Sequence, residues 1–297
     1  MEISNKEVLN HIKKAKKGNQ MSFNFLLDTF WGSVYSYQLS KIKKLPLLDR
    51  FSPSSQQELG VEEAGAYLTT QKLAYDCAEA IAKELQPGWS EKKTAELMDT
   101  YLQDHGVKSF FHKSFAWFGE RTRFDGVKYY WDFLPSKKRL LQENEAFILD
   151  TAPIFNGHAG DIGYSGKKGE VPGHDEVMDY LLELRVEIPK LFAQKLTSSQ
   201  IWTKVDELLK EQGYDNCHAR YPYEVLGHRL HQLPLSKFPG VTIPFSLHAY
   251  WGLMSRGLLP ELLGPFHEGS QVGLWAIEPH LGTNGFGAKF EEILVVE

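Results

Sequence analysis

Two aspartates, Asp150 and Asp161, lie on either side of a predicted turn at Asn156-Gly157. The apolar segment 146–155 before the turn is strand-like, and Asn-Gly is a strong signal for a two-residue hairpin turn. That register places Asp150 opposite Gly163 and puts both carboxylates on one face of the hairpin. Two like charges this close on an apolar strand are costly unless a cation lies between them. The spacing therefore predicts a metal site.

A second pair of carboxylates occurs near the end of the sequence. Glu278 follows an apolar segment, and the turn-forming residues 282–287 separate it from Glu291. A tight turn at Asn284-Gly285 places Glu278 directly opposite Glu291. Two hairpins that each present two carboxylates predict a duplicated architecture around two divalent metal ions. Manganese, iron, cobalt and zinc all suit a site of this kind.

The nitrogen ligand that such a centre needs is available in His228, which follows Gly227. Together these residues resemble those of the pita-bread metallohydrolases, the family of methionine aminopeptidase, aminopeptidase P, prolidase and creatinase. The metal ligands of that family are Asp, Asp, His, Glu and Glu in this order, and the matching residues here are Asp150, Asp161, His228, Glu278 and Glu291. The resemblance covers roughly residues 61–297. It implies an α+β pita-bread fold, in which two pseudo-symmetric halves of helices and antiparallel sheet surround a dinuclear metal site.

The resemblance also implies roles for individual residues. The metal ions would activate a water molecule, and Glu278 would carry a proton from that water to the leaving amine. His267, within Phe266-His267-Glu268, matches the second active-site histidine of the family and would stabilise the developing oxyanion. The implied function is that of a hydrolase, an aminopeptidase or Xaa-Pro-type peptidase that acts on small peptides.

The sequence departs from the family pattern where the substrate would bind. Aminopeptidases of the family have a histidine about one strand before the first Asp ligand, where this chain has Trp131 and Asp132. Arg229 replaces the glycine that follows the ligand histidine. These three residues are candidates for binding the substrate, together with His112 and His231, although a structural role is also open for His231.

An insertion of approximately residues 232–266 separates His228 from His267. It is rich in aromatic residues and leucines, which predicts either a core or subunit-interface segment or a lid over the pocket. The altered substrate region leaves two other functions open. One is non-peptide chemistry, either creatinase-like C–N hydrolysis or oxidation at a di-iron centre. The other is a non-catalytic binding module, which the intact ligand set disfavours.

Composition restricts the partners. A net charge of -5 and a pI of about 6.1 give no basic surface for nucleic acid. No apolar segment is long enough to span a membrane. The lack of an N-terminal signal sequence and the two cysteines, Cys77 and Cys217, favour a cytoplasmic protein without disulfides. A homodimer is the default expectation for the assembly.

The order of predicted elements suggests two domains. Residues 1–60 form a mostly helical N-terminal extension, and residues 61–297 form the catalytic domain. Hydrophobic periodicity and capping signals predict four helices in the catalytic domain, over 62–85, from Ser90 to about His105, over 175–196 and over 198–212.

Overall fold

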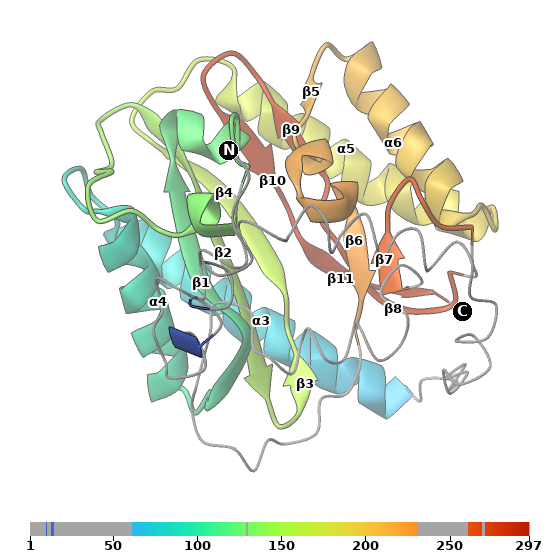
Figure 1. Cartoon of the computed structure of the whole chain (residues 1–297), viewed down its shortest axis with the longest axis horizontal. Helices are drawn as coiled ribbons and strands as arrows, with labels where there is room; N and C mark the ends of the chain where they lie inside the picture. Colours follow the sequence, from blue (N-terminus) through green and yellow to red (C-terminus); the bar gives the residue numbers. More distant parts are fainter. Residues whose placement is uncertain are drawn as a thin grey trace. The chain divides into compact units, whose positions relative to one another are not determined.

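A computed structural model describes residues 61–128, 130–230, 261–268 and 271–296, together with residues 10, 13 and 14. The chain divides into two compact units, Met1–Pro53 and Ser54–Glu297. Figure 1 shows the elements of the second unit, which carries the candidate site. Apart from residues 10, 13 and 14, the predicted helical extension lies outside the described residues, and so do His231 and most of the predicted insertion. None of the helices in the described ranges combines the length and the apolar character needed to cross a membrane.

The first half of this unit consists of two helices followed by an antiparallel sheet. Its elements are α3 (Val61–Glu84), α4 (Glu91–Asp104), β1 (Ser109–Phe118), β2 (Glu145–Phe155), β3 (His158–Ala159) and β4 (Ile162–Lys168). Helix α4 begins at the predicted cap, because the side chain of Ser90 accepts a hydrogen bond from the Lys93 N–H. The short helices η2 (Gly119–Arg123) and η3 (Tyr130–Phe133) connect β1 to β2. Strand β2 is central, since it pairs with β1 on one side and with β3 and β4 on the other.

The first carboxylate hairpin has the register that the sequence predicts. Asn156 and Gly157 both have positive φ, 52° and 86°, as a type I′ turn requires. Beyond the turn, Asp150 pairs with Gly163. The prediction of this hairpin is therefore confirmed.

The second half repeats the pattern of two helices followed by strands. The helices are α5 (His174–Ala193) and α6 (Ser198–Glu211). The strands are β5 (Asp215–Asn216), β6 (Gly227–Arg229), β7 (Leu262–Leu263), β8 (Gly273–Ile277), β9 (His280–Gly282), β10 (Gly287–Lys289) and β11 (Glu292–Val296). Two short 3-10 helices, η4 (His218–Arg220) and η5 (Pro222–Glu224), lie between β5 and β6. One sheet has the order β11-β8-β6-β7, and a smaller one has the order β10-β9-β5.

The second carboxylate hairpin also has its predicted register. Gly287 pairs with Gly282 near the turn, and Glu292 pairs with Ile277 farther along. The turn closes with a hydrogen bond of 2.8 Å from the Thr283 N–H to the Phe286 carbonyl. Lys289 pairs with His280 on one side of the two glutamates, and Glu292 pairs with Ile277 on the other, in the same register. Glu278 therefore stands opposite Glu291, as predicted.

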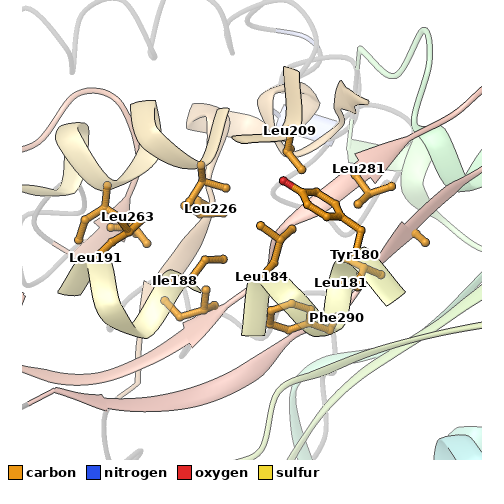
Figure 2. Close-up of a cluster of buried hydrophobic side chains, with 14 of the residues drawn as sticks. Tyr180, Leu181, Leu184, Ile188, Leu191, Leu209, Leu226, Leu263, Leu281 and Phe290 are labelled. Carbon is orange, nitrogen blue, oxygen red and sulfur yellow. The ribbon is translucent and has the colours of Figure 1, made fainter. Parts of the chain in front are cut away.

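Each half has its own hydrophobic core. In the first half, α3 and α4 pack on the sheet through residues such as Cys77, Met98 and Leu149. Figure 2 shows the core of the second half, where one face of α5 meets α6 and the strands. Its labelled side chains are Tyr180, Leu181, Leu184, Ile188, Leu191, Leu209, Leu226, Leu263, Leu281 and Phe290. Their spacing on α5 follows the helical repeat, so the helix buries a continuous stripe.

The two halves meet along their sheets. A third apolar cluster joins side chains of β1 and β2, such as Phe111 and Ala152, to Leu274 and Ala276 of β8. Strand β4 lies beside the second hairpin, where the Lys289 N–H donates to Ser165 Oγ at 2.8 Å. The Ser165 hydroxyl in turn donates to the Lys289 carbonyl at 2.7 Å. This junction brings the two carboxylate hairpins together.

Candidate metal centre

The five predicted metal ligands converge from both halves of the unit. Asp150 lies on β2, Asp161 directly precedes β4, His228 lies on β6, Glu278 directly follows β8, and Glu291 lies between β10 and β11. All five are buried, and the most exposed of them retain 8% of their accessible surface. Buried carboxylates require a cation or hydrogen-bond donors near them. The sequence predicts which residues meet, and the fold brings them together.

Asp161 is the centre of the cluster, because each of its oxygens faces a histidine. His228 Nε2 lies 3.2 Å from Asp161 Oδ2. His112 Nε2, from β1, lies 3.2 Å from Asp161 Oδ1 and 3.5 Å from Asp150 Oδ1. His112, a candidate substrate-binding residue from the sequence, therefore lies among the predicted ligands.

Both histidines are oriented by the backbone. His112 Nδ1 lies 2.9 Å from the Lys113 carbonyl, and His228 Nδ1 lies 3.2 Å from the Arg229 carbonyl. A carbonyl oxygen only accepts, so Nδ1 is the donor in each ring. This arrangement directs Nε2 toward Asp161, and it is typical of histidines that bind metals.

The electrostatics of the cluster favour positive charge. Burial alone would lower the pKa of His112, but Asp161 and Asp150 raise it to about 9. The pKa of His228 is also raised, since its contact with Asp161 outweighs its burial. Burial would raise the pKa of Asp161, and the two histidines instead hold it below its ordinary value. A divalent ion would replace these protons as the partner of Asp161.

The donor atoms form two adjacent triads that share Asp161. One triad is His112, Asp150 and Asp161, and the other is Asp161, His228 and Glu291. Within each triad the donor atoms lie within 4.8 Å of one another. Nitrogen and carboxylate donors at these separations fit a divalent transition metal such as manganese, iron, cobalt or zinc.

Lys289 is a member of the cluster that sequence reasoning missed. Its Nζ donates to Asp150 Oδ2 at 2.7 Å, to Glu278 Oε2 at 3.0 Å and to Glu291 Oε2 at 2.9 Å. Burial would lower the pKa of Lys289, but the three carboxylates raise it well above its ordinary value. The signal was present, because Lys289 lies two residues before Glu291 and alternate strand residues share a face.

Tyr221 and His280 lie next to Lys289, and sequence reasoning missed these two residues as well. His280 Nε2 lies 2.7 Å from the Thr122 carbonyl, which makes Nε2 the donor. His280 Nδ1 therefore accepts the hydrogen bond from the Tyr221 hydroxyl, at 2.9 Å. Burial and the charge of Lys289 hold the pKa of His280 well below its ordinary value. The ring centre of Tyr221 lies 5.6 Å from Lys289 Nζ.

Trp131 and Asp132, which the sequence analysis expects at the position of the family's first histidine, lie in η3 and are half-buried. Asp132 Oδ2 accepts a hydrogen bond of 2.9 Å from the Lys128 N–H. The neighbouring Phe133 ring packs near Tyr221, with ring centres 6.2 Å apart. Helix η3 thus packs near Tyr221 through Phe133, while the Asp132 carboxylate binds the backbone of the loop that precedes η3.

Arg229 and His267 each contact other parts of the second half. Arg229 follows His228 on β6, so its side chain points to the opposite face of the strand. There its guanidinium lies over Trp275, 4.5 Å from the ring centre, and donates to the Val272 carbonyl. The His267 carbonyl accepts a hydrogen bond of 3.0 Å from the Ser199 N–H at the start of α6.

Comparisons with known proteins agree with this architecture. A model of metallopeptidase family M24 matches residues 66–297. An X-Pro aminopeptidase from Thermotoga maritima MSB8 has a similar structure, with a TM-score of 0.59, 15% sequence identity and coverage of 79% of this chain and 58% of that one. The prolidase from Pyrococcus horikoshii OT3 aligns with a TM-score of 0.57 and 15% identity, covering 80% of this chain and 60% of the prolidase.

A mutant of Escherichia coli aminopeptidase P aligns with a TM-score of 0.53 and 14% identity, covering 80% of this chain and 53% of that one. A search of curated protein sequences finds no match. At these identities the structural matches establish the fold alone, and the α+β pita-bread fold expected from the sequence is confirmed.

Proposed function

Because the chain belongs to metallopeptidase family M24, we propose that it is a metal-dependent hydrolase of peptide bonds. The observation that carries this proposal is the pair of buried ligand triads that share Asp161. A binding module would not need to bury these costly groups together with two histidines oriented by the backbone. The intact donor set therefore supports catalysis.

We further propose that the substrate is a small peptide, cleaved at its N-terminal residue or at a Xaa-Pro bond. The similar structures of the X-Pro aminopeptidase and the prolidase support this substrate class. The chain spans 58% and 60% of the length of these two structures. The choice between aminopeptidase and dipeptidase therefore belongs to the proposal and to its test.

The proposed roles of the residues are those that the family resemblance implies. Asp150, Asp161, His228, Glu278 and Glu291 would hold the metal, with His112 as a further donor. Bound divalent metal would lower the pKa of a water molecule and polarise the scissile carbonyl. Glu278 would carry the proton from that water to the leaving amine. His267 is the proposed donor to the oxyanion that develops on the substrate.

The test is a hydrolysis assay with a panel of Xaa-Pro dipeptides, matched dipeptides without proline, and tripeptides. The protein is treated with a chelator and then loaded with Mn²⁺, Co²⁺ or Zn²⁺. We expect cleavage of one peptide class, its loss after chelation, and its absence in Asp161→Asn. If no peptide is cleaved although metal binds tightly, the peptidase proposal fails.

Non-peptide chemistry is the second candidate, because Trp131 and Asp132 replace the histidine that the sequence comparison sought before Asp150. His112 weakens this candidate, since it lies one strand before Asp150, on β1, and its Nε2 is 3.2 Å from Asp161 Oδ1. Assays with creatine-like C–N substrates test this function, and oxygen uptake in the presence of Fe²⁺ and a reductant tests oxidation. Turnover in either assay, without peptide cleavage, would replace the peptidase assignment.

A further inference from the structure

The Lys289 ammonium lies between three carboxylates, and such a position would also suit a metal ion. It donates one hydrogen bond to each of three residues, Asp150, Glu278 and Glu291, at 2.7, 3.0 and 2.9 Å. Three of the five predicted metal ligands thus direct an oxygen to one lysine nitrogen. A lysine ammonium has three N–H groups, so this contact uses all of its donors.

In Asp150 and Glu291, one carboxylate oxygen faces Lys289 and the other faces a histidine. Asp150 directs Oδ2 to Lys289, and its Oδ1 lies 3.5 Å from His112 Nε2. Glu291 directs Oε2 to Lys289, and its Oε1 lies 3.8 Å from His228 Nε2. One place is therefore lined by both histidines and Asp161, and the other is filled by the ammonium.

We propose that Lys289 is a built-in cation that takes the place of one of the two metal ions, so that the site binds a single divalent ion. This inference rests on the proposed metal-dependent function and refines it. The two triads share Asp161, and Asp150 and Glu291 each offer them a single oxygen, because Lys289 holds the other one. The triads therefore share one ion, which binds between Asp161 and the two histidines, toward Asp150 Oδ1 and Glu291 Oε1. It differs from the pair of ions expected from the sequence.

Contacts hold Lys289 in place along its whole length, from the backbone to Nζ. Ser165 binds both the N–H and the carbonyl of Lys289, at 2.8 and 2.7 Å. The aliphatic part of the side chain lies directly against Gly163, where an added β-carbon would overlap with Lys289 Cε. The side chain retains only 3% of its accessible surface. These constraints leave it little freedom to move aside for a second ion.

Electrostatics oppose an additional ion beside the ammonium. A divalent ion that used the same oxygens would lie within a few ångströms of the lysine charge, in surroundings where water screens poorly. Fully ionised, the four carboxylates of the cluster would carry four negative charges, and the ammonium with one divalent ion would offset three of them. A single ion is therefore enough to balance most of the charge.

The test is the number of Mn²⁺ ions bound per chain. The full-length protein is stripped with a chelator, titrated with Mn²⁺, and examined by elemental analysis and by electron paramagnetic resonance. The variants are Lys289→Met and Lys289→Gln, which remove the charge but keep much of the side-chain volume. Lys168→Met is the matched control, because Lys168 Nζ donates to the Ala82 carbonyl and not to the cluster.

We expect one Mn²⁺ per chain in the wild type and in Lys168→Met, with the spectrum of an isolated ion. We expect two in Lys289→Met or Lys289→Gln, with the spectrum of an exchange-coupled pair. Two ions in the wild type, or no increase in either folded Lys289 variant, would overturn the inference. Circular dichroism of each variant in the presence of Mn²⁺ establishes that it is folded.

The same experiment separates this inference from the proposed function. Two ions in the wild type together with peptide cleavage would overturn only the role of Lys289. One ion without any hydrolysis would leave the role of Lys289 standing and remove the proposed function. A wild type that binds no divalent ion would overturn both.

Discussion

His228 Nε2 lies 3.2 Å from Asp161 Oδ2, and both side chains are buried. His228 belongs to β6 in the second half of the fold, and Asp161 belongs to the hairpin of the first half. The two residues are 67 positions apart in the sequence. The candidate metal centre thus depends on the docking of the two halves, and metal binding should report on that docking.

Asp161→Asn should remove the metal. Asp161 belongs to both triads, so the loss of its charge weakens every position in the cluster. We expect the metal content after dialysis to fall from stoichiometric to near zero, with loss of nearly all activity. Asp179→Asn, which changes an exposed carboxylate on α5, is the control and should keep its metal. An Asp161→Asn variant with full metal content would contradict the assignment of the centre.

Divalent metal should stabilise the protein against heat. The carboxylates of the cluster repel one another, and a bound ion relieves this repulsion. A ligand that binds only the folded state at a hundredfold excess over its Kd stabilises it by about 2.7 kcal/mol. We therefore expect the Tm to rise when Mn²⁺ is added to chelated protein, as followed by differential scanning calorimetry. The shift should disappear in Asp161→Asn, and an equal shift there would place the stabilising ion elsewhere.

Asp132 should contribute to the binding of peptides with a free α-amino group, if its carboxylate replaces the missing histidine. Loss of such a charged hydrogen bond should lower kcat/KM on the order of 10-fold or more for Asp132→Ala. Because Asp132 also accepts from the Lys128 N–H, the variant Asp132→Asn is needed to separate the two roles. It keeps an acceptor for the loop and loses the charge.

The two variants give different results if Asp132 only holds its loop. In that case Asp132→Asn would retain wild-type kcat/KM, and only Asp132→Ala would be impaired. Metal content should be unchanged in both variants. N-acetylated peptides, which lack the amino charge, serve as the control substrates.

His218 should make the stability of the protein depend on pH. The ring is fully buried, and burial lowers its pKa to about 3. The neutral form is therefore favoured in the folded state. The stability that this form contributes is fully present above the ordinary pKa of 6.5. It is lost as the pH falls from there toward about 3, at up to about 1.36 kcal/mol per pH unit.

His218→Asn tests this dependence, because an Asn oxygen can replace Nδ1 as the acceptor for the backbone N–H of His280, whose nitrogen lies 3.5 Å away. Urea denaturation between about pH 4 and 7 should show a shallower loss of stability in the variant than in the wild type. Parallel curves for the two proteins would show that another group causes the acid sensitivity. At pH 7 the comparison measures only the change in packing.

The two hairpins and the four helices could be predicted because their signals are local. Asn156-Gly157 sets one register through its turn, and the helix α4 begins where Ser90 can cap it. Once the registers are known, the alternation of strand residues tells which carboxylates share a face. The identity of the five predicted ligands followed from their order along the chain and from the family resemblance.

Arg229 and Lys289 show what position in the sequence leaves open. Arg229 is adjacent to His228, yet strand alternation places its side chain on Trp275. Lys289 shares a face with Glu291, but its importance depends on Asp150, which is 139 positions away. Sequence reasoning had no measure of the distance between those two segments.

The sequence by itself determined which residues could bind a metal, because turns and the two-residue repeat of strands act within a few positions. The tertiary structure decided which of those residues contact Lys289 and which contact the histidines. The docking of β4 against the second hairpin places Lys289 between Asp150, Glu278 and Glu291, and it places His112 against Asp161. These contacts depend on the packing of the two halves, and no local preference of the chain encodes them.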